Sequence, residues 1–123
     1  MVEAVRSYKD LRVWRESMDL VVGVYRFSKE LPKEEMYGLT SQMRRAAVSI
    51  PANIAEGYGR ESSGAYAQHL RIEQGSLKEL ETHLLIANRI ELVSVGSIEP
   101  LSSHCDMIGK MLRGLIRSID SGS

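Results

Sequence analysis

Apolar residues recur every three or four positions along most of the chain, and this spacing constrains the fold more than any other feature. Residues three and four apart lie on one face of an α-helix, so each such stripe predicts an amphipathic helix. Extended alternation of apolar and polar residues, which is typical of strands, is nearly absent. The pattern therefore predicts an all-α fold. The longest stripe comprises Tyr66, Leu70, Leu77, Leu80, Leu84 and Ala87.

Turn-forming residues divide the stripes into four segments. Asp10 and Ser97 are expected to cap the first and last segments, and Gly57-Tyr58-Gly59 to end the second. The connections are short, which favours antiparallel neighbours. We therefore expect residues 1–123 to form one domain, an antiparallel up-and-down four-helix bundle. The predicted helices span about residues 10–30, 34–57, 63–93 and 98–120.

Pro51 falls inside the second predicted helix. Proline removes one backbone hydrogen bond and crowds the carbonyl group four residues earlier. We therefore expect a kink or a short break between Val48 and Ile50.

The segment 10–30 is apolar on two faces. A stripe through Leu11, Trp14, Met18, Val22 and Tyr25 is expected to face the core of the bundle. A second set lies on the opposite side, and we expect it to contact another copy of the chain, because the connections look too short to cover it. The alternative is an unevenly apolar surface. The predicted oligomer interface comprises Val13, Leu20, Val24 and Phe27.

The second predicted helix is unusually rich in polar and small residues. Arg45, Ser49, Asn53 and Glu56 flank its apolar stripe, and Glu73 lies in register with the apolar stripe of the third helix. A buried carboxylate needs a partner, for which Arg44 and Arg45 are the candidates. We interpret the set as a structural hydrogen-bond network that fixes helix register. A catalytic or ligand site is the alternative, although neither Ser49 nor Thr40 has a histidine nearby in sequence.

Sixteen basic and sixteen acidic residues give a formal net charge of +0, so any attraction to nucleic acid must be local. Lys110, Arg113 and Arg117 are spaced along one edge of the fourth helix, and Arg44 lies on the second. These four residues are the candidate nucleic-acid contacts, and a solvated charged face is the alternative.

No metal or cofactor is expected. Ferritin-like bundles use Glu-x-x-His motifs, which this chain lacks, and His69 with Glu73 at i, i+4 more often forms a surface pair than a ligand set. Ser103-His104-Cys105-Asp106 is not a catalytic group, because consecutive helical residues point in different directions. We therefore expect a protein that is not an enzyme.

The single cysteine, Cys105, excludes an intramolecular disulfide and fits a reducing cytoplasm. The N-terminal residues lack the apolar stretch of a secretory signal, and no run reaches the roughly 20 apolar residues that a membrane helix needs. We expect a cytoplasmic protein without membrane contact.

Three stretches resemble the bacterial four-helix-bundle proteins encoded in intervening sequences of large-subunit ribosomal RNA genes. They are LRVW at residues 11–14, YGLTSQMRRAAVSIPANIAEG at 37–57 and GSLKELET at 75–82. The resemblance implies a four-helix bundle that assembles as a homopentamer. Some related proteins are accessory variability subunits of diversity-generating retroelements, which bind a reverse transcriptase and nucleic acid through basic surfaces. The balanced charge of this chain departs from that pattern. The family supplies no catalytic residue.

The sequence and the resemblance together favour a non-enzymatic oligomeric scaffold that contacts RNA or an RNA-associated protein. The alternative is a protein interaction module without direct nucleic-acid binding, such as an accessory subunit of a reverse transcriptase. An enzyme would require a deep polar pocket around Glu73.

Overall fold

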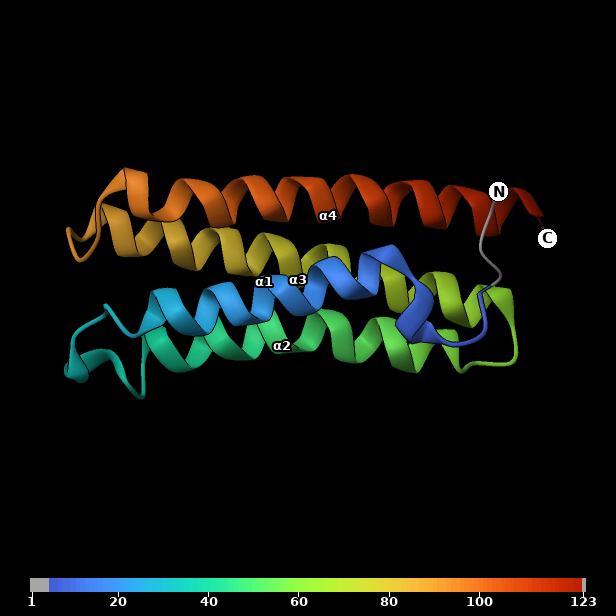
Figure 1. Cartoon of the computed structure of the whole chain (residues 1–123), viewed down its shortest axis with the longest axis horizontal. Helices are drawn as coiled ribbons and strands as arrows, with labels where there is room; N and C mark the ends of the chain where they lie inside the picture. Colours follow the sequence, from blue (N-terminus) through green and yellow to red (C-terminus); the bar gives the residue numbers. More distant parts are fainter. Residues whose placement is uncertain (1–4, 123) are drawn as a thin grey trace.

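The computed structural model describes residues 5–122, which form four long helices and two short 3₁₀ helices (Figure 1). The long helices run back and forth along the molecule, as the predicted antiparallel bundle requires. The predicted domain, residues 1–123, extends beyond the described range at both ends. The elements are η1 (Tyr8–Asp10), α1 (Arg12–Ser28), η2 (Lys33–Glu35), α2 (Leu39–Tyr58), α3 (Ser63–Arg89) and α4 (Val95–Gly122).

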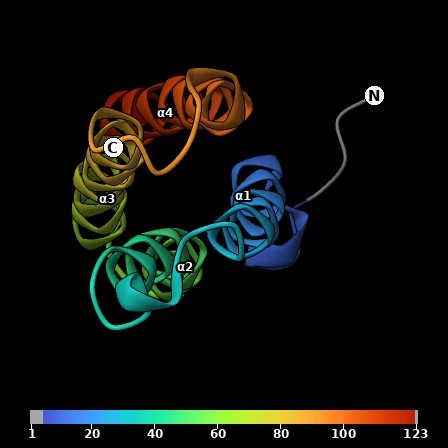
Figure 2. The same ribbon diagram turned by 90° about the vertical axis from the view of Figure 1, so that its left-hand side faces the viewer.

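Each helix packs against two neighbours around a common core (Figure 2). α2 lies between α1 and α3, and α4 lies between α3 and α1, so that α2 and α4 are diagonal to each other. The α2 and α3 helices share the most extensive contact, whereas α1 and α4 contact each other least. None of the described helices combines the length and apolarity that a membrane crossing requires.

Capping residues move two of the predicted helix starts. Asp10 closes a capping box with Ser7 around η1, and α1 begins only after it, at Arg12. The hydroxyl of Ser94 accepts a hydrogen bond from the backbone N–H of Ser97 (3.2 Å), so α4 begins at Val95. The prediction of Ser97 as the cap was wrong, because Ser94 satisfies the first free N–H groups of the helix three residues earlier.

The α3 helix ends at Arg89, earlier than predicted, because the chain turns at Glu91. Glu91 has a φ of 66°, the left-handed conformation that usually favours glycine. The N–H of Leu92 donates to the carbonyl group of Ala87 (3.0 Å), and the N–H of Glu91 donates to that of Asn88 (3.0 Å). This pair of bonds is a Schellman motif. Glu91 takes the position that glycine usually occupies, so the sequence lacks the usual signal for the end of a helix.

The α2 helix continues through Pro51, so the short break expected between Val48 and Ile50 does not occur. Pro51 itself is buried. Its missing N–H leaves the carbonyl group of Ala47 without the usual helical donor. α2 packs against both α1 and α3, and tertiary packing of this kind supplies most of a helix's stability.

The two apolar faces of α1 are reversed relative to the prediction. Val13, Leu20, Val24 and Phe27 are buried in the core of the chain itself, so their assignment to an oligomer interface was wrong. Ser17 lies in the middle of this buried stripe and interrupts its apolar pattern. Its hydroxyl donates to the carbonyl group of Val13 (2.7 Å), which satisfies the buried polar group within the helix.

The α2 and α3 helices approach closely where α2 ends. A Cβ atom placed on Gly57 would lie 2.6 Å from the Cβ of His69. Only glycine fits at this position without a shift of one helix.

We therefore expect Gly57→Ala to lower the free energy of unfolding by about 1–3 kcal/mol, because it forces α2 and α3 apart. Gly114→Ala is the matched control, since a Cβ there meets no atom within 4 Å. The control should raise stability by up to about 1 kcal/mol. Urea unfolding followed by circular dichroism measures both, and equal stabilities for the two variants would contradict the close approach.

Candidate functional site

An apolar surface covers the outer side of α1 and the adjoining part of α2. Met18, Val22, Tyr25 and Val48 are 42%, 46%, 40% and 42% exposed, and we call these four residues the α1–α2 face. Trp14 is half-buried beside them and contacts Tyr8 of η1 edge-on, with ring centroids 5.3 Å apart. The stripe that the sequence assigned to the core of the bundle thus lies largely at the surface.

Arg44 joins α1 to α2 instead of reaching into solvent. Its guanidinium lies over the ring of Tyr25, 4.5 Å from the ring centroid, and its Nε donates to the hydroxyl of Ser28 (2.8 Å). A cation held over an aromatic face is stabilised by the ring quadrupole. Arg44 is therefore an element of α1–α2 packing, and it lies apart from the other predicted nucleic-acid contacts.

Only part of the predicted polar network forms. The hydroxyl of Ser49 donates to that of Ser76 on α3 (3.0 Å), and the Asn53 amide donates to the carbonyl group of Ser49 (2.8 Å). Arg45 is exposed, and Glu56 pairs with Arg60 at the surface (2.7 Å). The α2–α3 contact thus contains a small hydroxyl pair, and the two charged members of the predicted network on α2 lie outside it.

Glu73 is fully buried and has no polar partner among the described residues. Its side chain is 0% exposed, and neither carboxyl oxygen accepts a hydrogen bond. The predicted pairing with Arg44 or Arg45 was therefore wrong. Burial disfavours the charged form and raises the pKa of Glu73 to about 8.

His69, one helical turn before Glu73, points its ring toward the end of α2. Its Nε2 accepts a hydrogen bond from Arg60 Nε (3.2 Å), and its Nδ1 has no partner in the described part of the chain. His69 and Glu73 do not form an ion pair with each other. Across residues 5–122, no group of three or more potential ligands is placed to hold a metal ion.

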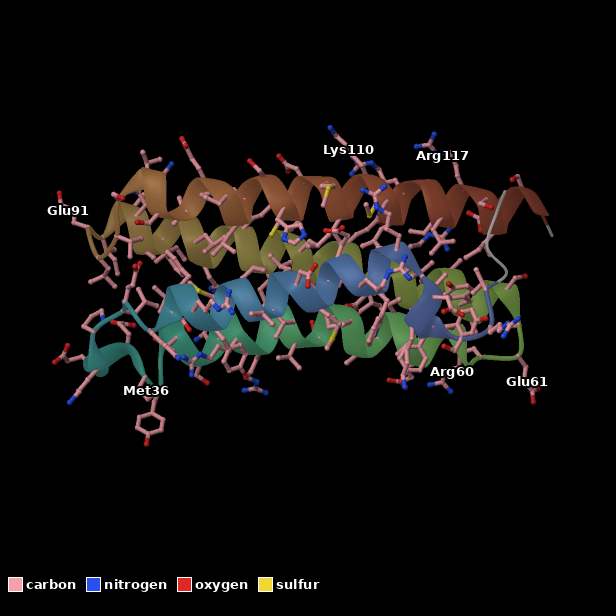
Figure 3. The ribbon with its side chains drawn as sticks, in the orientation of Figure 1. Met36, Arg60, Glu61, Glu91, Lys110 and Arg117 are labelled. Carbon is pink, nitrogen blue, oxygen red and sulfur yellow. The ribbon has the colours of Figure 1, made fainter. Side chains whose placement is uncertain are left out.

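The basic side chains of α4 form a row at the surface. Lys110, Arg113 and Arg117 follow each other at three- and four-residue spacing and are exposed. Figure 3 shows Lys110 and Arg117 extending away from the bundle on the side of α4. No hydrogen bond or ion pair joins any of the three to another described residue. We call these three residues the α4 basic row. It is separated from Arg44, because α2 and α4 are diagonal.

Two features of the structure were missed at the level of sequence. His104 on α4 forms a 2.8 Å hydrogen bond with Glu16 on α1, across the least extensive helix pair. A hollow also opens between α3 and α4 beside Gly75 and Gly109. Glycine in the middle of a helix is unfavourable and is a signal of such a site, whereas no local spacing relates His104 to Glu16.

The buried carboxyl group makes stability depend on pH. The pKa of Glu73 is about 8 when folded and about 4.5 when exposed, so the folded chain holds a proton that the unfolded chain loses. The contribution of Glu73 to stability is therefore greatest below about pH 4.5, falls as the pH rises toward 8, and then levels off. The total loss is up to about 5 kcal/mol.

We expect Glu73→Gln to remove most of this pH dependence and to raise the free energy of unfolding at pH 8, because the amide stays neutral. Urea unfolding at pH 5, 6.5 and 8 measures the effect. Glu61→Gln is the control, since Glu61 is exposed in the α2–α3 connection. A Glu73→Gln profile parallel to that of the unmodified chain would show that the carboxyl group is not the cause.

Comparison with known proteins identifies relatives of the chain. Residues 9–114 match the family described as 23S rRNA-intervening sequence protein. No curated protein matches. The fold is similar to the crystal structure, at 1.70 Å resolution, of a protein with unknown function from the S23 ribosomal protein family of Bacteroides thetaiotaomicron. The TM-score is 0.78 and the sequence identity 25%, over 85% of this chain and 97% of that one. Because the family match spans most of its length, the chain belongs to the 23S rRNA-intervening sequence protein family.

Proposed function

We propose that this protein is a non-enzymatic subunit of a homo-oligomer, and that the α1–α2 face joins the copies. The observation that carries the proposal is the exposure of four large apolar side chains on one continuous side of the bundle. Exposed apolar patches of this kind are typical of interaction sites. A homopentamer is also what the resemblance of the sequence implies.

The charges of the chain favour a second copy as the occupant of this face. The formal net charge is +0, so two copies do not repel each other. Exposed charges of both signs surround the apolar residues, with Arg15 and Asp19 on α1 and Arg45 on α2. Such a mixed rim permits pairing between copies.

The chemistry of the interior supports a role without catalysis. Among the described carboxyl groups, that of Glu73 has the most strongly shifted pKa. Glu73 is buried in the core, however, and lines none of the five described cavities. Burial raises the pKa of the Cys105 thiol to about 12, so this group stays protonated and is a poor nucleophile. Neither group is arranged to act on a substrate.

We expect the unmodified chain to show a mass in light scattering that is a multiple of 13.8 kDa. Val48→Glu should reduce the mass to 13.8 kDa while circular dichroism shows that the helices persist, because the new carboxylate would have to be desolvated in the interface. Ile72→Glu is the matched control, since Ile72 is 50% exposed on α3 and lies outside the α1–α2 face. A monomeric unmodified chain, or equal dissociation by both variants, would refute the assembly.

A second part of the proposal is that the α4 basic row contacts RNA. These residues have no carboxylate partner among the described residues, and they lie on the helix diagonal to α2. Assembly through the α1–α2 face would leave them accessible and would repeat the row in every subunit. An RNA that contacts the rows of several subunits at once would bind more tightly than it binds one row, although each single contact is unchanged.

Fluorescence anisotropy with a structured RNA at 50 and 200 mM salt tests this contact. Three phosphate contacts predict an affinity loss of about 20- to 40-fold between these concentrations. Replacing Lys110, Arg113 and Arg117 with glutamine should remove most of the salt dependence, whereas the same change at Arg26, Lys29 and Lys33 should not. No salt-sensitive binding at micromolar protein would refute the RNA contact and favour the alternative, a module that binds only a protein such as a reverse transcriptase.

A further inference from the structure

The hollow between α3 and α4 is a candidate ligand site whose apolar base the proposed scaffold role does not use. It has a volume of about 440 Å³, which is within the range of pockets for small organic molecules. Its apolar base includes Leu77 and Cys105, which are 2% and 1% exposed. The hollow can therefore accept a compact apolar group.

Two glycines line this hollow, although the neighbouring atoms leave room for a Cβ atom at both positions. A Cβ on Gly75 would meet no atom within 4 Å, and one on Gly109 would make only ordinary contacts, at 3.7 Å to Arg113 Nη1 and 3.9 Å to Leu77 Cδ1. The situation differs from that of Gly57, where the neighbouring helix leaves no room. Alanine would fit at both positions and would strengthen the helices, so steric crowding does not explain the two glycines.

The charges around the hollow favour an anion. On the α3 side, Lys78 and Glu81 form an ion pair at 3.3 Å and offset each other. On the α4 side, Lys110 and Arg113 face a single acid, Asp106, and neither cation is paired with a described residue. Because Arg113 Nη1 and Leu77 Cδ1 would both lie within 4 Å of a Cβ on Gly109, the guanidinium of Arg113 lies beside this glycine, at the edge of the apolar base.

We propose that the α3–α4 hollow binds a small amphipathic organic anion. Its apolar body lies over Leu77 and Cys105, and its anionic group contacts Arg113 and Lys110. Arginine suits this role, because its planar guanidinium can donate two parallel hydrogen bonds to a carboxylate, sulfonate or phosphate group. The proposal does not depend on oligomer formation. It shares Lys110 and Arg113 with the α4 basic row, so a bound anion would compete with RNA at these two residues.

The test is a fluorescence titration with 1-anilinonaphthalene-8-sulfonate, which combines a compact aromatic body with one anionic group. We expect binding at micromolar concentration, with an affinity about tenfold higher than that of the uncharged N-phenyl-1-naphthylamine. Gly75→Leu should reduce the affinity for the sulfonate by about tenfold while raising the melting temperature by a few degrees. Arg113→Gln should remove the preference for the charged probe.

Two controls separate this site from other parts of the surface. Gly114→Ala changes a glycine of the same helix that does not line the hollow, and it should leave binding unchanged. Val48→Glu disrupts the α1–α2 face, another apolar surface able to hold the probe, and it should also leave binding unchanged. Loss of binding in Val48→Glu, retention in Gly75→Leu, or equal affinity for the two probes would overturn the proposal.

Discussion

The close contact between α2 and α3 is the constraint on which the rest of the bundle depends. Gly57 admits the side chain of His69 where a Cβ would collide, and two serine hydroxyls bond across the same helix pair farther along. Small residues let two backbones approach, and the approach brings the apolar stripes of both helices into one core. α1 then packs on α2 and α4 packs on α3, and α1 and α4 meet each other least extensively (Figure 2). The helix pair with the least room for change thus forms one side of the bundle, and α1 and α4 form the other.

Much of the fold follows from the sequence, because helix formation is governed by spacing that can be read locally. The four helices, their order and the family resemblance were all predicted from such patterns and are confirmed. The faces of α1 were not predicted correctly, since its two stripes are almost equally apolar and Ser17 interrupts the one that is buried. The Ser17 hydroxyl donates to a carbonyl group of its own helix, so Ser17 can be buried without a partner on another helix. Nothing in the sequence therefore marks this serine as a core residue. Which stripe is buried depends on the neighbouring helices, and this information is not local.

The candidate sites were predicted less well than the fold, for a related reason. A charged residue identified by its spacing can serve the interior, a neighbouring helix or solvent, and only the tertiary structure decides among them. Arg44 was grouped with the cations of α4, yet it stacks on Tyr25 and binds Ser28. Glu73 was placed correctly at the core, but the inference that a buried acid must have a basic partner failed. Protonation is the other way to avoid a buried charge, and a raised pKa is its consequence.

The protonated carboxyl group of Glu73 explains how the bundle can hold an acid without a compensating network. In the neutral form the side chain costs much less to bury than a charge, and above its pKa that advantage is lost. A carboxyl group with a strongly raised pKa is often part of an active site, but this one is buried and lines none of the five cavities described within residues 5–122. The perturbation is therefore a property of the core. Chemistry available to other molecules lies on the outside of the bundle, where the apolar face lies on α1 and α2 and the basic row of α4 adjoins the α3–α4 hollow.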